Sequence, residues 1–204
     1  MKKILCFGDS NTYGFIPSSG KRYDENSRWS GILKKLLREE YEIIEAGCNN
    51  RTAFCDNPAG VNETGYKVLP SLLTPDIDCV ILAVGINDLQ YLYNISMKDY
   101  ESGLENLIGL VRTKLPRAKI ILLSPSVITE DILNSYFAAM FDETSIEKSK
   151  QLSAIYERAA RKENCKLLDL KKIASPSKTD GLHYEKIEHI KIANAIFDLI
   201  NHKG

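Results

Sequence analysis

A serine near the start of the sequence and an acidic residue and a histidine near its end are of the types that carry out nucleophilic catalysis. Ser10 follows an apolar run that ends at Gly8, so a strand would deliver its hydroxyl to the edge of a sheet. Asp180 and His183 are three residues apart, so one loop can present both groups. A serine hydroxyl is a weak nucleophile until a base removes its proton, and that base needs a third group to orient it. We therefore predict Ser10 as nucleophile, His183 as general base and Asp180 as the residue that orients His183.

Three positions are candidates for stabilising the negative oxygen of a tetrahedral intermediate. The backbone N–H of Ser10 would point into the same space as its hydroxyl. Asn87 follows another apolar run, and its side-chain amide can donate a hydrogen bond to an oxyanion. Gly47 also follows an apolar run, and its lack of a Cβ would let a substrate approach the backbone N–H. The predicted oxyanion hole is therefore Ser10, Gly47 and Asn87, although Gly47 and Asn87 would also suit ordinary turns.

The other histidines and the cysteines do not form a metal-binding pattern. His189 falls within a predicted C-terminal helix among polar neighbours and His202 falls in the terminal tail, so both are expected at the surface. The five cysteines lack the paired spacing of metal ligands. We therefore expect no metal.

Short apolar runs alternate with helix-length segments along the chain, which is typical of repeated βαβ units. The predicted strands cover residues 3–8, 41–45, 78–84, 119–124 and 166–168. Apolar residues at helical spacing predict helices near 29–37, 97–111 and 184–200. Parallel strands with right-handed crossovers form a three-layer α/β/α sandwich with a five-stranded sheet. Ligands bind beyond the carboxyl ends of such strands, where Ser10, Gly47 and Asn87 fall.

Length and charge exclude several classes of protein. A chain of 204 residues suits one domain spanning 1–204. Its 27 basic and 27 acidic residues balance, which argues against a nucleic-acid or membrane partner. No segment approaches the ~20 apolar residues of a membrane span, and the first apolar run is too short for a signal peptide. These features predict a cytoplasmic protein, and they leave a homo-oligomer open.

Four segments follow one another in an order that is more specific than any one of them. They read Gly-Asp-Ser-Asn at 8–11, Gly at 47, Gly-Ile-Asn-Asp at 85–88 and Asp-Gly-Leu-His at 180–183. They resemble blocks I, II, III and V of the SGNH/GDSL hydrolase superfamily, whose name spells Ser, Gly, Asn and His. Further segments are similar to its bacterial arylesterase and acyltransferase branch, namely 27–31, 45–47, 51–52 and 66–70.

The resemblance implies a flavodoxin-like sheet of strand order 2-1-3-4-5, no cofactor and an acyl-enzyme on Ser10. The implied substrates are small-molecule esters, thioesters or O-acetyl sugars. The sequence departs from the usual pattern at Asn11, where leucine is common, and at Asn49 and Asn50, which make the second loop more polar. We expect these three asparagines to contact the substrate.

The segment 127–141 is the apolar insertion that follows the fourth predicted strand. It would overhang the site, where Phe137 and Phe141 would limit the length of the acyl group. The same segment would also suit a helix packed on its own domain or on a neighbouring subunit. Because the other loops near the site are polar, we predict short acyl groups, from acetyl to butyryl.

A flavodoxin-like module that binds flavin mononucleotide is the main alternative. The segment Ser-Asn-Thr-Tyr-Gly at 10–14 resembles a hydroxyl-rich phosphate loop at a strand end. This interpretation leaves Asn87, Asp180 and His183 without a role, whereas the hydrolase interpretation uses all of them.

Overall fold

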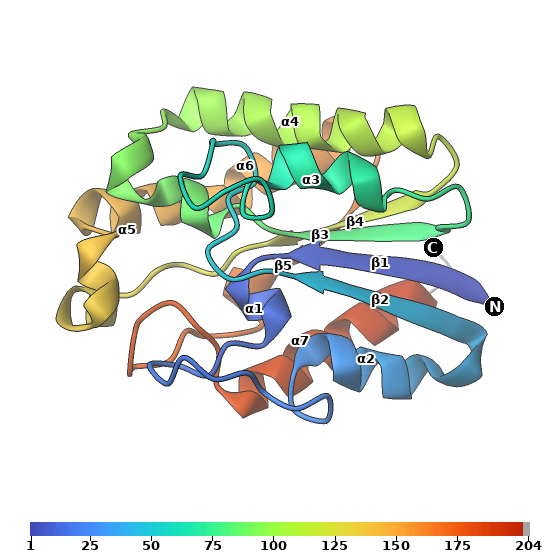
Figure 1. Cartoon of the computed structure of the whole chain (residues 1–204), viewed down its shortest axis with the longest axis horizontal. Helices are drawn as coiled ribbons and strands as arrows, with labels where there is room; N and C mark the ends of the chain where they lie inside the picture. The colour runs from blue at the N-terminus through green and yellow to red at the C-terminus, as the bar shows by residue number, and fades with distance from the viewer. Residues whose placement is uncertain (202–204) are drawn as a thin grey trace.

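A parallel five-stranded sheet forms the middle layer of the protein, whose computed structural model describes residues 1–201 (Figure 1). The strand order is β2-β1-β3-β4-β5, as the resemblance implied, and every pair is parallel. The strands are β1 (Lys2–Gly8), β2 (Tyr41–Gly47), β3 (Cys79–Ala83), β4 (Lys119–Ser124) and β5 (Lys166–Asp169). The predicted α/β/α sandwich with five strands is confirmed, and the predicted strand ends differ from these by two residues or fewer.

Helices cover both faces of the sheet (Figure 1). One face carries α3 (Gly65–Leu72), α4 (Met97–Lys114) and α6 (Leu152–Lys162), and the other carries α2 (Trp29–Leu37) and α7 (Lys186–Asn201). Two shorter helices lie toward the carboxyl ends of the strands, α1 (Ser10–Tyr13) and α5 (Glu143–Ser149). Short 3-10 helices complete the chain: η1 (Arg38–Glu40), η2 (Ile86–Leu89), η3 (Tyr91–Tyr93), η4 (Glu130–Asn134), η5 (Tyr136–Ala139) and η6 (Leu170–Lys172). No helix within residues 1–201 is long and apolar enough to cross a bilayer.

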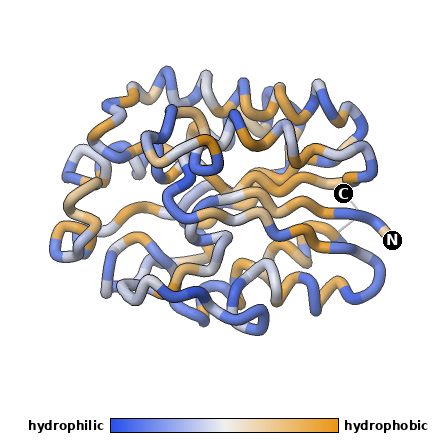
Figure 2. Tube along the Cα trace, viewed as in Figure 1, coloured by the Kyte–Doolittle hydropathy of each residue, from blue (hydrophilic) through white to orange (hydrophobic). Residues whose placement is uncertain are grey.

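The core consists of two apolar layers, one on each side of the sheet. Successive side chains of β1 point to opposite faces, so Leu5 and Phe7 join the layer under α4, whereas Ile4 and Cys6 join the layer under α2 and α7. Because both faces are covered, the strands read as continuous apolar runs, which Figure 2 shows along the middle of the molecule. Each such buried Leu, Ile or Phe side chain contributes about 1.5–3 kcal/mol to stability.

His189 corrects one prediction, since it is fully buried and not at the surface. Its Nδ1 accepts a hydrogen bond from the backbone N–H of Trp29 at 3.3 Å, which joins α7 to the first residue of α2. Burial lowers the pKa of His189 to about 4, so the ring is neutral and can accept this bond. The polar neighbours of His189 in the sequence gave the wrong indication because this turn of α7 packs against α2. His202 lies outside the described residues.

Candidate active site

The structure brings together the three residues predicted for nucleophilic catalysis. Ser10 Oγ lies 2.9 Å from His183 Nε2, and His183 Nδ1 lies 2.9 Å from Asp180 Oδ2. All three side chains are buried, with residue exposures of 5% for Ser10, 1% for His183 and 0% for Asp180. This geometry lets the imidazole take the hydroxyl proton while the carboxylate holds the Nδ1–H.

Ser10 is placed by the turn between β1 and α1. Asp9 caps α1, because its side chain accepts the backbone N–H of Asn11 at 2.9 Å. Asp9 is itself buried, and burial raises its pKa to about 7 despite that bond. The helix ends at Gly14, whose φ of 88° is left-handed and therefore favours glycine. A rigid one-turn helix thus carries the nucleophile at its first position.

Asp180 is held by backbone donors as well as by His183. Its Oδ1 accepts the N–H groups of Leu182 and His183 at 3.1 and 3.0 Å, and its Oδ2 also accepts the N–H of Ser18 at 3.1 Å. Burial alone would raise the pKa of Asp180, but the hydrogen bonds and the charge of His183 bring it below the ordinary value. The carboxylate is therefore ionised and fixed in direction.

The loop that carries Asp180 and His183 packs directly on the segment after β4. Gly181 has a φ of 70°, and a Cβ there would overlap the backbone nitrogen of Ile132. The carbonyl of Gly181 accepts the N–H of Thr129 at 3.0 Å. The start of the predicted insertion is thus a fixed support for the catalytic loop.

Asn11 was predicted to contact the substrate, but its side chain joins two catalytic segments. Its Nδ2 donates to the carbonyl of Leu182, and its Oδ1 accepts the N–H of Tyr184, both at 3.3 Å. These bonds flank His183 in the sequence. Asn11 therefore connects the helix of the nucleophile to the loop of the base.

Asn87 lies in η2, directly after β3, and its amide is held in one orientation. Nδ2 donates to the carbonyl of Arg51 at 3.0 Å, and Oδ1 accepts from Nε2 of Gln90 at 3.2 Å. A carboxamide carries two N–H donors, so one remains for a substrate oxygen. Asn87 lines the same cavity as Ser10 and His183, which suits the predicted oxyanion role.

Gly47 occupies a different place from the one predicted. It is the last residue of β2, paired with Gly8, and a Cβ there would overlap the backbone nitrogen of Tyr13. Its glycine identity therefore serves the close approach of α1, and Gly47 does not line the cavity. Asn49 and Asn50, for which we predicted substrate contacts, do line it, and Asn50 has a φ of 59°. The second loop thus reaches the site through residues 49–50.

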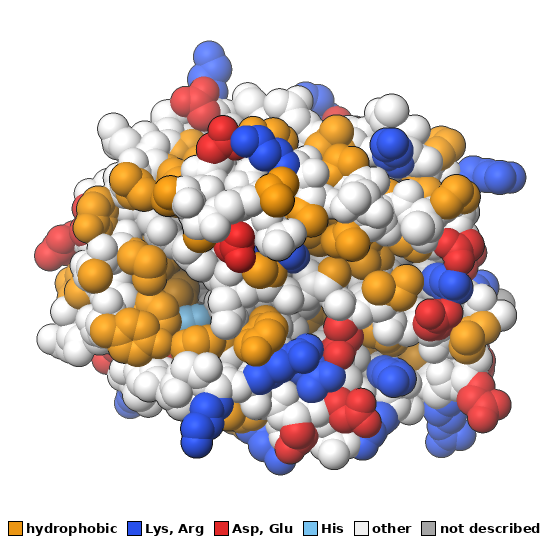
Figure 3. All heavy atoms as spheres, in the orientation of Figure 1, with side chains coloured by type: hydrophobic (Ala, Val, Ile, Leu, Met, Phe, Trp, Pro, Cys, Tyr) orange, Lys and Arg blue, Asp and Glu red, His pale blue; other side chains and the backbone are white. Residues whose placement is uncertain are grey.

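A cavity of about 160 Å³ opens above the nucleophile. Figure 3 shows hydrophobic side chains gathered around a hollow, with a histidine at its floor, at the end of the molecule where α5 lies. The polar lining consists of Ser10, His183, Asn49, Asn50 and Asn87, and the apolar lining consists of Phe15, Tyr136, Phe137, Met140 and Leu182. Phe141, which was expected to limit acyl length, instead packs in the core with 1% exposure.

The model of the GDSL-like lipase/acylhydrolase family matches residues 6–186. The chain belongs to this family. No curated protein matches the sequence.

Solved structures of similar proteins support this membership of the GDSL-like acylhydrolases. A carbohydrate acetylesterase from Sinorhizobium meliloti, Est24, has 30% identity and a TM-score of 0.91 over 98% of each chain. An aryl esterase of M. smegmatis has 27% identity and a TM-score of 0.89, again over 98% of each chain. A lipase/acylhydrolase from Enterococcus faecalis, at 22% identity and a TM-score of 0.71 over 98% of this chain and 95% of its own, shares the fold. The flavin-binding alternative finds no support, and Ser10 in its proposed phosphate loop is bonded to His183.

Two charged residues of this acylhydrolase hold the backbone near the site through hydrogen bonds, and neither was assigned a role from the sequence. The Arg51 guanidinium donates to the carbonyls of Gly8 and Ala46 at 3.0 and 2.5 Å, which ties together the ends of β1 and β2. Asp88 accepts the N–H groups of residues 53–55 at 2.6–2.9 Å. Burial raises the pKa of Asp88 to about 6, although these donors act in the opposite direction. Arg51 and Asp88 both come shortly after strand ends in the sequence. This position is the signal that could have indicated a role at the site.

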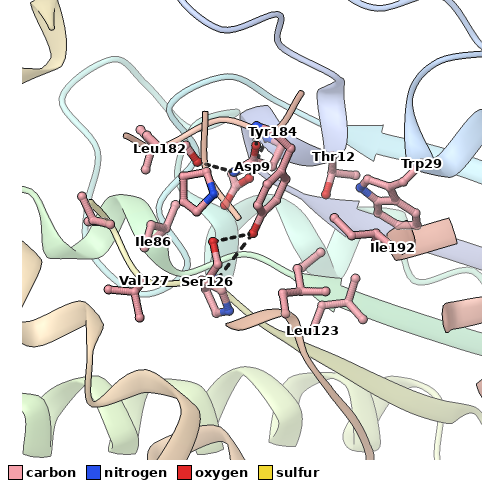
Figure 4. Close-up of a pocket in the computed structure, with 16 residues that line it drawn as sticks. Asp9, Thr12, Trp29, Ile86, Leu123, Ser126, Val127, Leu182, Tyr184 and Ile192 are labelled. Atoms are coloured by element: carbon pink, nitrogen blue, oxygen red, sulfur yellow. Dashed lines mark hydrogen bonds between the residues drawn. The ribbon is translucent and has the colours of Figure 1, made fainter. Parts of the chain in front are cut away.

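A smaller cavity of about 30 Å³ in this acylhydrolase is lined by Asp9, Asn11 and Thr12, which are close to the nucleophile in the sequence (Figure 4). Its lining includes Tyr184, which donates to Ser126 Oγ at 2.9 Å, and also Trp29. A cavity of this size has room for about one water molecule and not for an ester. We therefore place the reaction in the larger cavity.

Replacing Asn87 with alanine should lower kcat about 10²–10³-fold and change KM much less, because an oxyanion donor acts mainly when charge develops. The measurement is steady-state hydrolysis of p-nitrophenyl acetate. Asn87→Asp is the matched variant, because it keeps the size of the side chain and removes both amide donors. An effect limited to KM in both variants would instead make Asn87 a substrate-binding residue.

Proposed function

We propose that this GDSL-like acylhydrolase cleaves esters of short carboxylic acids, acetyl to butyryl, through an acyl-enzyme on Ser10. The observation that carries the proposal is the Ser10–His183–Asp180 arrangement, with both hydrogen bonds at 2.9 Å, at the floor of a small cavity. Family membership supports ester hydrolysis, and the geometry supports the assignment of each residue.

In the first half of the reaction, Ser10 Oγ attacks the carbonyl carbon while its proton passes to His183 Nε2. The electron pair of the C=O bond moves to the carbonyl oxygen, where the backbone N–H of Ser10 and the amide of Asn87 are the proposed donors. The electron pair then returns from the carbonyl oxygen to re-form the C=O bond, the bond to the alcohol oxygen breaks, and that oxygen takes the proton from Nε2. The alcohol leaves, and the acyl group remains on Ser10.

In the second half, water takes the place of the alcohol. His183 removes a proton from the water, whose oxygen attacks the acyl carbon, and the proton is then returned to Ser10 Oγ as the ester bond breaks. The carboxylic acid leaves, and the enzyme is regenerated. Asp180 stays ionised throughout and stabilises the imidazolium that forms in each half.

The size and lining of the cavity support short acyl groups. At about 160 Å³ it is below the ~300–1,000 Å³ of most ligand sites, and asparagines occupy part of its lining. A cavity of this volume leaves little room to bury a fatty acyl chain, although half of the residues that line it are apolar. Acetylated sugars are included among the proposed substrates, because a similar structure is that of a carbohydrate acetylesterase. We also propose a cytoplasmic location, because the five cysteines are free thiols, as is usual for proteins of a reducing compartment.

Wild-type enzyme should have a kcat/KM at least about tenfold higher for p-nitrophenyl acetate or butyrate than for the octanoate, since a chain too long for the cavity fits only if lining side chains move, which costs binding energy in the transition state. The three esters share one leaving group, so their ratio reports on the acyl group alone. The assay is run below the solubility limit of the octanoate. Equal or higher activity on octanoate would overturn the short-chain proposal and leave ester hydrolysis intact.

A further inference from the structure

A cavity of about 190 Å³ lies at the amino ends of the strands, and it is larger than the cavity of about 160 Å³ at the active site. The strands begin at the end of the molecule where α7 ends, and α5 lies at the opposite end (Figure 1). At about 3.3 Å per residue, the seven residues of β1 separate the two ends of the sheet by roughly 20 Å. A molecule in this amino-end cavity would therefore not reach Ser10.

The register of the sheet gathers basic side chains at this cavity. Lys2, Lys119 and Lys166 are the first residues of β1, β4 and β5, and all three line it. Side chains two residues apart in a strand point to the same face, and Ile4 and Ile121 belong to the apolar layer under α2 and α7. The lysines therefore point to a helix-covered face of the sheet, where strands are ordinarily apolar.

The positive charge at this cavity exceeds the negative charge. Arg117, in the turn before β4, adds a fourth cation, and the carboxylate in the lining is that of Asp78. Asp78 Oδ2 already accepts the backbone N–H of Lys3 at 2.8 Å. In the described residues 1–201, Lys2, Arg117 and Lys119 form no ion pair. Because the charges of the whole chain balance, this excess is local and attracts anions.

The cations surround an apolar floor. Its side chains come from β1, β4 and the last turn of α7, namely Ile4, Ile121, Leu199 and Ile200. Lys166 Nζ donates to the carbonyl of Leu199 at 2.8 Å, which fixes the end of α7 against the sheet. Burial raises the pKa of Cys79, also in the lining, to about 12, while the charges of Lys119 and Lys166 act in the opposite direction. The field of these lysines thus reaches the floor of the cavity.

We propose that the amino-end cavity is a second binding site, which takes a small organic acid with one anionic group and an apolar part. The guanidinium of Arg117 and the ammonium groups of Lys2 and Lys119 hold the carboxylate or phosphate through charge-assisted hydrogen bonds. The apolar part covers the isoleucines and the end of α7. Apolar enclosure with a few polar groups that fix orientation is the usual composition of a ligand site. The proposal does not depend on the substrate of the active site.

The test is a titration of ¹⁵N-labelled wild-type protein with benzoate and with phenyl phosphate, followed by amide chemical shifts. Saturable shifts are expected at residues 2–4, 117–121 and 199–200, and not in the active-site loops. Whichever acid binds more tightly shows whether the site prefers a carboxylate or a phosphate. Benzyl alcohol keeps the ring without the charge, acetate keeps the charge with a single methyl group, and both should bind at least about tenfold more weakly than benzoate. Added salt should weaken the binding of benzoate.

Charge reversal at Lys119 tests the cationic part of the site. Lys119→Glu should weaken the binding of benzoate about tenfold or more. Lys119→Gln removes the charge without reversing it and should cause a smaller loss, and the midpoint of thermal unfolding shows that each variant is folded. Lys98→Glu is the matched control, because Lys98 is exposed in the first turn of α4 and outside the cavity lining. It should bind benzoate as wild type does.

Three outcomes would overturn the proposal. The first is equal binding of benzoate and benzyl alcohol, and the second is an equal loss of affinity in Lys98→Glu and Lys119→Glu. The third is the absence of saturable shifts at the amino ends of the strands with either acid, including the case in which shifts are confined to the active-site loops.

Discussion

Replacing Ser10 with alanine should lower kcat by about 10⁴-fold or more, because the variant loses the atom that forms the acyl-enzyme. The fold should be preserved. The Ser10 hydroxyl bonds to the His183 ring, and the residue that caps α1 is Asp9. The measurement is kcat for p-nitrophenyl acetate, together with mass spectrometry after treatment with a fluorophosphonate. Wild type should gain one label, on Ser10.

Ser124→Ala is the control for this prediction. Ser124 is another fully buried serine, and it ends strand β4 much as Ser10 follows the end of β1. This variant should keep both its activity and its label. Labelling of the Ser10→Ala protein at another residue, with activity near wild type, would exclude Ser10 as the nucleophile.

Asp180→Asn should lower kcat by about 10⁴-fold, because an amide facing Nδ1 favours the tautomer whose Nε2 already carries a proton. Such an imidazole cannot accept the proton of Ser10. The Asp180 carboxylate also accepts the N–H groups of Ser18, Leu182 and His183, so some loss of stability should accompany the loss of activity. The measurement is kcat for p-nitrophenyl acetate beside the midpoint of thermal unfolding.

The matched control for Asp180 is Asp131→Asn, which makes the same chemical change in η4. Asp131 accepts a hydrogen bond from the hydroxyl of Thr129 and has no contact with His183. Activity close to wild type is expected for this control. Near-normal turnover in Asp180→Asn itself would assign the orientation of His183 to another group.

The sequence predicted the fold and the triad because both depend on local patterns that the tertiary structure leaves in place. Apolar runs of strand length become buried strands almost regardless of their neighbours, and the carboxyl ends of parallel strands meet at one edge. Ser10 and Asn87 follow such ends directly. Their positions were therefore fixed by topology as soon as the strands were recognised.

Predictions that depended on how a loop or helix packs against the rest of the chain were less accurate. Glycine at 47 signals a close approach, but the sequence cannot tell whether a substrate or the backbone of α1 makes it. Phe137 and Phe141 are four residues apart, yet only Phe137 lines the cavity, because Phe137 lies in η5 and the chain turns into the core after that helix ends at Ala139. His189 likewise has polar neighbours, and its burial depends on how α7 packs on α2.

The bond between Ser10 and His183 joins residues 173 positions apart, which has a consequence for how activity arises during folding. Closing a loop of this length costs conformational entropy, so the contact exists only while the folded elements between the two residues hold them together. A chain that has assembled β1, β2 and β3 already presents the serine hydroxyl but has no base to activate it. The nucleophile therefore becomes reactive only when the segment before α7 docks, and a chain still in the course of folding cannot cleave esters.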